Sequence, residues 1–150
     1  NEALYSELIQ LDNIIGMKDS SGDIYTLGHL ASTWKDSVIF EGEDSLLLSS
    51  LIAGAVGGIG ASYNLMPELY VRLWGAYKEN NIDKAAEIQA RVNEIIRTLL
   101  TSPDLIGGIK QVLRWMNLEC GAPRSPNRTL RDEETTKLRQ AFDRIGFFDN

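Results

Sequence analysis

The sequence predicts an α/β fold with parallel strands, and three observations support this prediction. The 150 residues are 43% hydrophobic and 24% charged, which is the composition of a folded globular domain. Over residues 1–66, short apolar runs alternate with segments of helical periodicity, which is typical of parallel strands joined by right-handed crossovers. From Pro67 onward the pattern is helical. We therefore expect βα units over residues 1–66 and helices over residues 67–150, within one compact unit.

The elements of the first part follow from local patterns. Four apolar residues with helical spacing predict that the chain begins near the end of a helix: Leu4, Leu8, Ile9 and Leu11. Asp23 is expected to cap the next helix. The strands are expected at residues 14–18, 38–41 and 57–61, and the helices between them at residues 24–33 and from about residue 45 to residue 53. The glycines make the third strand the weakest of these predictions.

The second part predicts four helices separated by breaks in the pattern. Pro67 suits a first helical turn, while Asn80–Asn81 and Ser102–Pro103 interrupt helical periodicity. The helices are expected at residues 67–78, 82–100, 106–117 and 132–145.

Composition excludes several classes of function. The 21 acidic and 15 basic residues give a net charge of −6, which argues against a nucleic-acid-binding surface. No apolar run reaches the roughly 18 residues that a membrane helix needs, so we expect no membrane partner. With one cysteine, Cys120, and one histidine, His29, neither an internal disulfide nor a Cys-based metal site is possible. We expect a cytoplasmic protein without metal or cofactor.

The sequence is also expected to be a fragment of a longer protein. It begins at Asn1 without an initiator methionine or a signal peptide. Three parallel strands make a poor sheet alone, because parallel strands need both faces covered.

Lys18 is the strongest candidate for chemistry. It follows an apolar strand and precedes a polar loop, and ligands of parallel α/β folds bind at the carboxyl ends of strands. An amine that is partly desolvated there is a nucleophile toward carbonyl groups. Alternation puts Gly16 on the same face, which we expect to leave room beside the amine. The alternative is a surface lysine at the end of a strand.

The other two strand ends carry polar or glycine-rich loops on the same rim. Asp44 follows the second strand, and it is a candidate for binding a substrate hydroxyl or for capping the following helix. Residues 60–64 follow the third strand. The carboxylates of Glu41, Glu43 and Asp44 are clustered, but a solvated loop explains them better than a metal site does.

Several segments together resemble the dihydrodipicolinate synthase and N-acetylneuraminate lyase family. They are residues 16–23, 41–44, 54–64 and 109–124, in the family's order and spacing. The resemblance runs over nearly the whole chain but covers only the C-terminal half of the family's length. It implies the C-terminal part of a TIM (β/α)8 barrel, with about three parallel strands and their helices, followed by a C-terminal helical extension.

The resemblance also implies roles for individual residues. Lys18 would form a Schiff base with pyruvate or another 2-oxo acid. Ser20 would line the site, and Gly42 and Asp44 would contact the substrate. The backbone carbonyl of Ile59 would face the bound pyruvate unit. The family resemblance further implies a homo-oligomer, a tetramer.

The resemblance leaves the substrate open. Sialic acid lyases usually carry an acidic residue after the Asp44 position and a serine at the Ala61 position, whereas this chain has Ser45 and Ala61. Residues 58–64 nevertheless match the lyase branch better than dihydrodipicolinate synthases. A shorter sugar acid, such as a 2-keto-3-deoxy acid, fits this mixture. The alternative is 4-hydroxy-tetrahydrodipicolinate synthase of lysine biosynthesis.

A second alternative is a catalytically incomplete fragment. In the family, a proton-relaying tyrosine and a Thr/Ser pair that binds the pyruvate carboxylate lie upstream of the position of Asn1. Tyr5 and Tyr63 do not match those motifs. We therefore expect this chain to need a partner chain for turnover.

Overall fold

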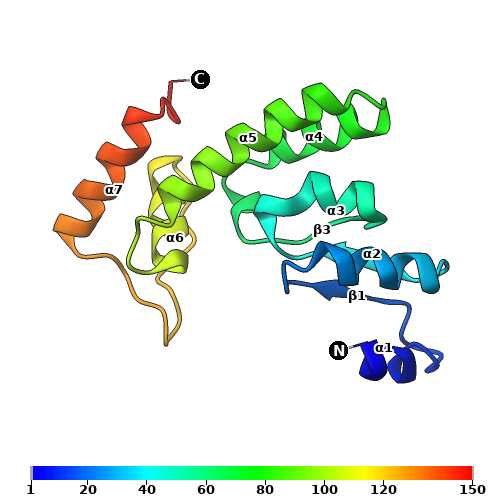
Figure 1. Cartoon of the computed structure of the whole chain (residues 1–150). Helices are drawn as coiled ribbons and strands as arrows, with labels where there is room; N and C mark the ends of the chain where they lie inside the picture. The colour runs from blue at the N-terminus through cyan, green and yellow to red at the C-terminus, as the bar shows by residue number, and fades with distance from the viewer. Residues whose placement is uncertain (1, 150) are drawn as a thin grey trace.

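A computed structural model describes residues 2–149, in which a three-stranded parallel sheet of order β1-β2-β3 precedes a series of helices (Figure 1). The first part comprises α1 (Glu2–Leu8), β1 (Gly16–Asp19), α2 (Ile24–Thr33), β2 (Val38–Glu41), the 3-10 helix η1 (Asp44–Leu46), α3 (Leu47–Ala53), β3 (Gly57–Gly58) and the 3-10 helix η2 (Ser62–Asn64). The second part comprises α4 (Pro67–Lys78), α5 (Ile82–Leu99), α6 (Leu105–Trp115) and α7 (Asp132–Arg144). The predicted α/β class with parallel strands is confirmed.

Two strands differ from the prediction in their bounds. β1 runs from residue 16 to 19 instead of 14 to 18, because pairing with β2 continues to the point where the Gly42 N–H donates to the carbonyl of Asp19 at 2.5 Å. β3 has two residues instead of five. Its pairing ends where the Ile59 N–H donates to the Glu41 carbonyl at 2.8 Å, and Ala61 already has right-handed helical dihedral angles.

The helices agree closely with the prediction, apart from the buried face of α1. The carboxylate of Asp23 accepts a hydrogen bond from the Thr26 N–H at 3.0 Å, as expected for the cap of α2. In α1, however, Leu4 and Leu8 are exposed, and Tyr5 is the residue that is buried. Tyr5 packs edge-on against a tryptophan of the α2 end, so an aromatic contact rather than a leucine stripe fixes this helix.

The two faces of the sheet differ, as period-2 alternation requires. Met17 and Ile39 pack in the core under the helices. Lys18 pairs with Phe40 in the β1–β2 register and lies on the opposite face. A Cβ atom at Gly16 would lie 1.8 Å from the carbonyl oxygen of Val38, so the glycine allows β1 and β2 to approach each other. The room expected beside the amine stays a prediction.

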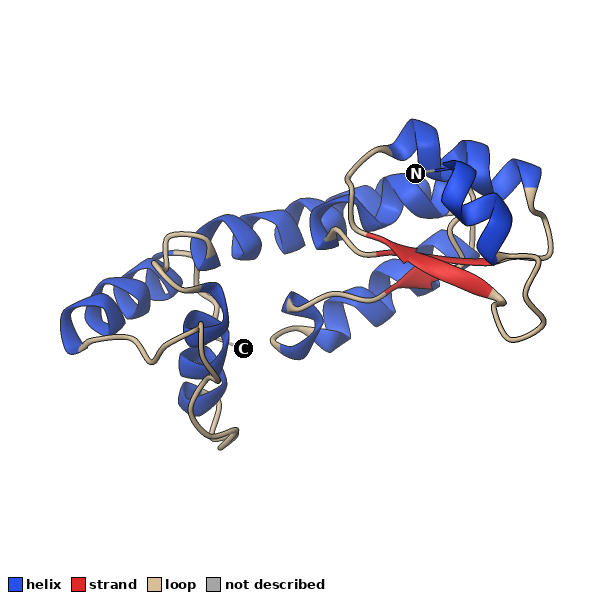
Figure 2. Ribbon diagram, turned by 90° about the horizontal axis from the view of Figure 1, so that it is seen from below, coloured by secondary structure: helices blue, strands red, loops and turns tan. Residues whose placement is uncertain are grey.

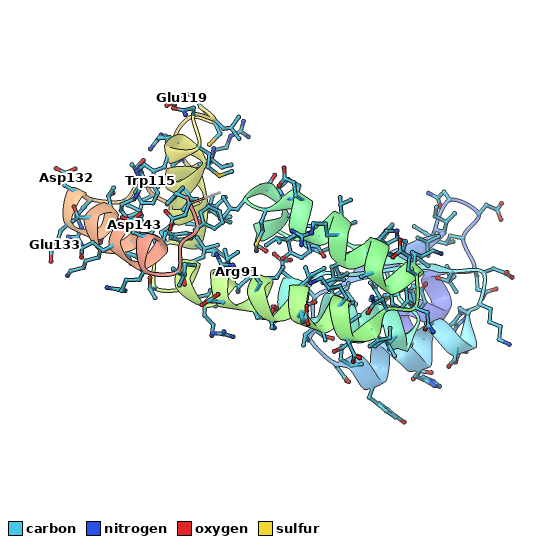
Figure 3. All side chains as sticks on the ribbon, turned by 90° about the horizontal axis from the view of Figure 1, so that it is seen from above. Arg91, Trp115, Glu119, Asp132, Glu133 and Asp143 are labelled. Carbon is cyan, nitrogen blue, oxygen red and sulfur yellow. The ribbon has the colours of Figure 1, made fainter. Side chains whose placement is uncertain are left out.

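The helices pack in sequence along the chain: α2 contacts α3, α3 contacts α4, and α4 lies antiparallel to α5 (Figures 1 and 2). Helix α5 then extends beyond the sheet to α6 and α7. There the ring of Trp115 on α6, which Figure 3 labels, packs edge-on against Phe148. The Arg139 guanidinium of α7 lies over both rings. Within residues 2–149 we find no helix with the length and hydropathy needed to cross a membrane.

Candidate active site at the strand ends

A cavity of about 280 Å³ lies at the carboxyl ends of the strands, between the sheet and the long helix α5. Its floor is apolar and comes from α5 and α6, while its polar wall comes from the strand-end loops. Of the five predicted site residues, the structure brings Lys18, Gly42 and Asp44 to this cavity. Ser20 and Ile59 do not line it.

The Lys18 side chain passes through the space that the missing side chain of Gly42 leaves free. A Cβ atom at residue 42 would lie 2.5 Å from Lys18 Cε and 2.0 Å from Ser20 Oγ, so only glycine fits there. Gly42 thus leaves room for the lysine stem, and the Ser20 hydroxyl lies at the same side of this glycine. The Lys18 residue is exposed, so the partial desolvation expected at this strand end is absent in the described chain.

Asp44 is held by the loop after β3 and does not cap a helix. Its Oδ2 accepts hydrogen bonds from the Ser62 backbone N–H at 2.7 Å and from Ser62 Oγ at 2.6 Å. The cap of the η1 turn is Glu43, which accepts from the N–H and the hydroxyl of Ser45. The capping interpretation of Asp44 was wrong, because the neighbouring carboxylate already satisfies the free N–H group of that turn.

A glycine is again required beside Asp44. A Cβ atom at residue 60 would lie 1.3 Å from Asp44 Oδ1, so Gly60 lets the carboxylate lie against the β3 loop. Ser62 bonds to Oδ2, and within residues 2–149 Oδ1 accepts no hydrogen bond, which leaves its lone pairs unused by the protein.

Two tyrosines lie behind Ser62. The Tyr70 hydroxyl is 2.6 Å from Ser62 Oγ, and both residues are buried. The rings of Tyr63 and Tyr70 are stacked at 3.7 Å, but the buried Tyr63 hydroxyl has no hydrogen-bond partner in the described chain. Burial raises the pKa of both phenols, and the negative charge of Asp44 raises the pKa of each further. Both hydroxyls therefore stay protonated at neutral pH.

The carboxylate of Glu41 supports the loop that carries Gly42 and Asp44. Glu41 is buried, and it accepts hydrogen bonds from the Glu43 N–H at 2.6 Å and from the hydroxyl of Ser50 on α3. A buried carboxylate is tolerated when such donors surround it. The sequence analysis grouped Glu41 with the exposed acids. Its partner Ser50 lies nine residues along the chain, and no local pattern in the sequence reveals that contact.

Helix α5 also holds this loop, through hydrogen bonds of the Gln89 side chain. The buried Gln89 side chain accepts from the Leu48 N–H at 3.0 Å and donates to the Asp44 carbonyl at 3.4 Å. The helical second part thus positions a residue of the candidate site. Sequence reasoning missed this contact, because it joins residues more than 40 positions apart.

Clustered carboxylates at this rim do not form a metal site. Within residues 2–149, no group of three or more His, Cys, Asp or Glu side chains has a geometry that could hold a metal ion. The carboxylates of Glu41, Glu43 and Asp44 are instead engaged by backbone N–H groups and hydroxyls.

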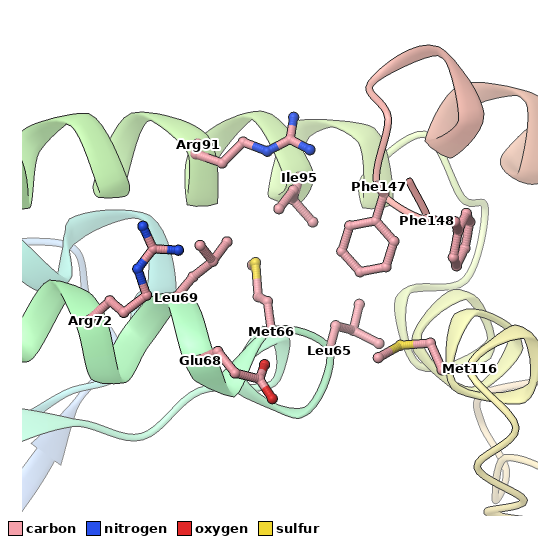
Figure 4. Close-up of a pocket in the computed structure, with 10 residues that line it drawn as sticks. All are labelled: Leu65, Met66, Glu68, Leu69, Arg72, Arg91, Ile95, Met116, Phe147 and Phe148. Carbon is pink, nitrogen blue, oxygen red and sulfur yellow. The ribbon is translucent and has the colours of Figure 1, made fainter. Parts of the chain in front are cut away.

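A larger cavity of about 430 Å³ lies between α4, α5 and the C-terminal segment (Figure 4). Its walls are mainly apolar, with Glu68, Arg72 and Arg91 among the lining residues, and Arg91 is paired with Glu94 at 2.5 Å. None of the predicted site residues lines it. Size alone does not make a site, and the smaller cavity is the candidate because it combines an amine with a fixed carboxylate.

Comparison with known proteins finds one matching family model and relatives that are lyases or synthases. The model of the dihydrodipicolinate synthetase family matches residues 3–145. The N-acetylneuraminate lyase 2 of Escherichia coli O6:H1 is 35% identical over 125 residues, which are 81% of this chain and 41% of the lyase. The 4-hydroxy-tetrahydrodipicolinate synthase of Archaeoglobus fulgidus is 32% identical over 140 residues, which are 93% of this chain and 48% of the synthase.

Solved structures show the same similarity. The wild-type sialic acid aldolase of Ruminococcus gnavus superimposes with a TM-score of 0.89 and 31% identity, over 97% of this chain and 50% of the aldolase. A catalytic lysine mutant of that aldolase gives a TM-score of 0.89 with 30% identity, over 97% of this chain and 49% of that chain. The chain therefore spans about half the length of the proteins it matches, and its fold is that of part of a TIM barrel with a helical extension.

Proposed function

Since this chain belongs to the dihydrodipicolinate synthetase family, we propose that it is the lysine-bearing half of a class I aldolase whose Lys18 forms a Schiff base with pyruvate or a 2-oxo sugar acid. Family membership and the similarity to lyases support aldolase chemistry in general. The Schiff base, the substrate and the role of each residue belong to the proposal.

The observation that carries the proposal is that Lys18 and Asp44 line the same cavity at the strand ends. The amine supplies a nucleophile and the carboxylate supplies a hydrogen-bond acceptor for a hydroxyl group. The similar Ruminococcus gnavus structure with a substituted catalytic lysine supports the choice of a lysine as the reacting group.

The proposed reaction follows from imine chemistry. The free Lys18 amine attacks the carbonyl carbon C2 of the 2-oxo acid, and loss of water gives an imine that is protonated on nitrogen. In the cleavage direction the C4 hydroxyl loses its proton, the C3–C4 bond breaks to release an aldehyde, and the electron pair enters the imine as an enamine. Protonation of C3 and addition of water then release pyruvate and restore the amine.

The base that removes the C4 hydroxyl proton is not assigned to this chain. Resemblance to the family places that role on a tyrosine upstream of residue 1, together with the pyruvate-carboxylate site. We therefore propose that residues 1–150 bind and activate the 2-oxo acid, and that turnover requires the other half of the barrel. The exposure of Lys18 in the described chain is consistent with this.

The lining of the cavity favours a short sugar acid. Ala61 offers a methyl group where sialic acid lyases usually carry a serine, and Ser45 turns its hydroxyl to Glu43 at 2.7 Å. Of the two carboxylates that line the cavity, Glu43 is engaged by Ser45, so Asp44 is the acceptor that we propose for a hydroxylated chain. A 2-keto-3-deoxy acid presents fewer hydroxyl groups than sialic acid and suits this smaller set of partners.

Borohydride trapping tests the substrate class. The chain is incubated with pyruvate, with 2-keto-3-deoxygluconate or with N-acetylneuraminate, then reduced and weighed as an intact protein. We expect a single reduced adduct with pyruvate and with the shorter sugar acid, less with N-acetylneuraminate, and none with L-lactate, which lacks the carbonyl group. Equal labelling of Lys18→Arg and of the wild-type chain would refute the proposal.

A second candidate function is 4-hydroxy-tetrahydrodipicolinate synthase, which the Archaeoglobus fulgidus relative favours through its coverage of 93% of this chain. The two candidates differ in the aldehyde that the enamine attacks. The pyruvate-loaded chain, supplemented with the other half of the barrel, is offered L-aspartate semialdehyde or D-glyceraldehyde before reduction. Condensation with glyceraldehyde alone supports the sugar-acid aldolase, and condensation with the semialdehyde alone supports the synthase.

The complete protein is further proposed to act in the cytoplasm as a homotetramer. This rests on the family resemblance and on the single, exposed cysteine of the chain. Light scattering of the complete protein measures the assembly directly, and a monomer would contradict the proposal.

A further inference from the structure

Building on the proposed function, we infer that Ser62 and Tyr70 are positioning residues, which hold Asp44 so that a single carboxylate oxygen selects substrates with a hydroxylated tail. The inference starts from the geometry of the Asp44 side chain. Ser62 contributes two donors to Asp44, its backbone N–H at 2.7 Å and its hydroxyl at 2.6 Å, and both reach Oδ2.

The direction of the hydrogen bonds follows from the number of protons. An ionised carboxylate can only accept hydrogen bonds, so the Ser62 hydroxyl donates its one proton to the bond with Asp44. The oxygen of Ser62 must then accept from Tyr70, whose hydroxyl lies 2.6 Å away. The donors therefore point one way, from Tyr70 through Ser62 to Asp44. Burial keeps the Tyr70 phenol protonated, so this donor is present throughout the neutral range.

This arrangement divides the two oxygens of Asp44 between separate tasks. Oδ2 is occupied by Ser62, while Oδ1 lies against Gly60 and accepts no hydrogen bond from the described residues. Pyruvate has no hydroxyl group to donate to Oδ1, whereas a sugar acid does. The network therefore affects the binding of the tail and not the formation of the imine at Lys18.

Tyr63 provides a matched control on the same loop. Its ring stacks on Tyr70 at 3.7 Å, but its buried hydroxyl has no partner in the described chain. Removing that hydroxyl deletes no hydrogen bond, and it relieves a buried unsatisfied donor. Tyr63→Phe thus changes the partly buried tyrosine that stacks on Tyr70 without changing the network.

The test compares Tyr70→Phe, Ser62→Ala, Ser62→Thr and Tyr63→Phe with the wild-type chain by NMR. The first readout is the rotamer of Asp44, taken from three-bond couplings of its carboxyl carbon to the backbone. The second is the ratio of the dissociation constants for pyruvate and for 2-keto-3-deoxygluconate. Neither readout requires turnover, and folding of each variant is checked in the same spectra.

We expect one Asp44 rotamer in the wild type, Ser62→Thr and Tyr63→Phe, and rotamer averaging in Tyr70→Phe and Ser62→Ala. The preference for the sugar acid should fall by roughly tenfold to a hundredfold in the last two variants, which is the contribution of a hydrogen bond to a charged group. Binding of pyruvate should stay unchanged.

A fixed Asp44 rotamer in both Tyr70→Phe and Ser62→Ala would overturn the inference, and so would an unchanged ratio of dissociation constants. Equal weakening of both ligands would overturn it too, because that indicates a general structural role. If the wild-type chain binds neither ligand, the proposed aldolase function fails for this chain, while the rotamer measurement still decides whether Ser62 and Tyr70 position Asp44.

Discussion

The two hydrophobic cores of the chain differ in size and in the elements that they join. The large core joins α3 to α7 and includes residues such as Leu73, Val92 and Phe142, which are fully buried. The small core lies between the sheet, α1 and α2, and its buried members are Tyr5, Leu27, Leu30, Ile39 and Ala55. The candidate site lies where the two regions meet, with Lys18 on the side of the small core and Asp44 on the side of the large core.

The two cores support different residues of the candidate site. Asp44 is fixed by Ser62 and by Gln89 of α5, so the large core determines its position. Lys18 stands on a strand that only the small core supports, and it is exposed. Within residues 2–149, Asp44 is therefore the more firmly held of these two candidate site residues, and Lys18 is the more exposed.

The largest expected effect is in the large core. Phe142→Ala removes a side chain with 0% exposure and should lower the free energy of unfolding by about 3–5 kcal/mol. Urea unfolding followed by circular dichroism measures this change. Val71→Ala, at a side chain that is 70% exposed, should change it by less than about 0.5 kcal/mol. Similar effects from the two substitutions would show that the helical core is not what stabilises the chain.

A matching substitution in the small core should act locally. Leu27→Ala, at 2% exposure, should cost about 2–3 kcal/mol and open α1, β1 and α2 more than the rest of the chain. Hydrogen exchange then accelerates for amides of those elements, while amides in the middle of α5 keep their protection. If α5 loses protection to the same extent, the two cores unfold as one unit and the comparison between them is wrong.

A smaller effect is expected where α5 holds the site loop. Gln89→Leu leaves the Leu48 N–H without its acceptor and should cost about 1–3 kcal/mol, the penalty of an unsatisfied buried donor. Gln140→Leu, on the exposed face of α7, serves as the control. The Asp44 amide should shift in NMR spectra of the first variant only. An unshifted amide would mean that α5 does not position the loop.

The smallest effect concerns the start of α7 and depends on pH. Arg128 binds both oxygens of Glu134 at 2.7 and 2.9 Å, and this ion pair together with Arg131 holds the pKa of Glu134 well below its usual value. Because the folded-state pKa is depressed, the contribution to stability is complete at neutral pH and is lost as pH falls below about 4, the region of an unperturbed glutamate.

Glu134→Gln should therefore lower Tm by a few degrees at most at pH 7, and the difference from wild type should shrink toward pH 3. Glu133→Gln is the neighbouring control, because Glu133 pairs only with the exposed Lys137. Thermal melts over this pH range measure both. A difference that grows on acidification would contradict the assignment of the ion pair.

Much of the fold could be predicted because its signals are local. Asp23 directly precedes α2 and caps it by accepting from the N–H of Thr26, three residues along the chain. Val38–Glu41 is a β-branched and aromatic run between turn formers. Lys18 could be singled out because it follows such a run at the end of a parallel strand.

The parts that could not be predicted depend on contacts between distant residues. Ser62 reaches Asp44 across 18 positions, and Gln89 reaches Leu48 across 41. No periodicity encodes these pairs, so a local cap remained one of the two roles predicted for Asp44. The end of β3 was missed for the same reason, because the alternation of glycine and apolar residues does not reveal where pairing with β2 stops.

The most direct test of the account is the position of the trapped adduct among the six lysines of the chain. The chain is reduced with borohydride in the presence of pyruvate, digested and mapped by mass spectrometry. We predict that the adduct lies on Lys18, with Lys35 and the four lysines of the second part unlabelled. An adduct spread over the exposed lysines, or confined to a residue other than Lys18, would contradict the Schiff-base assignment.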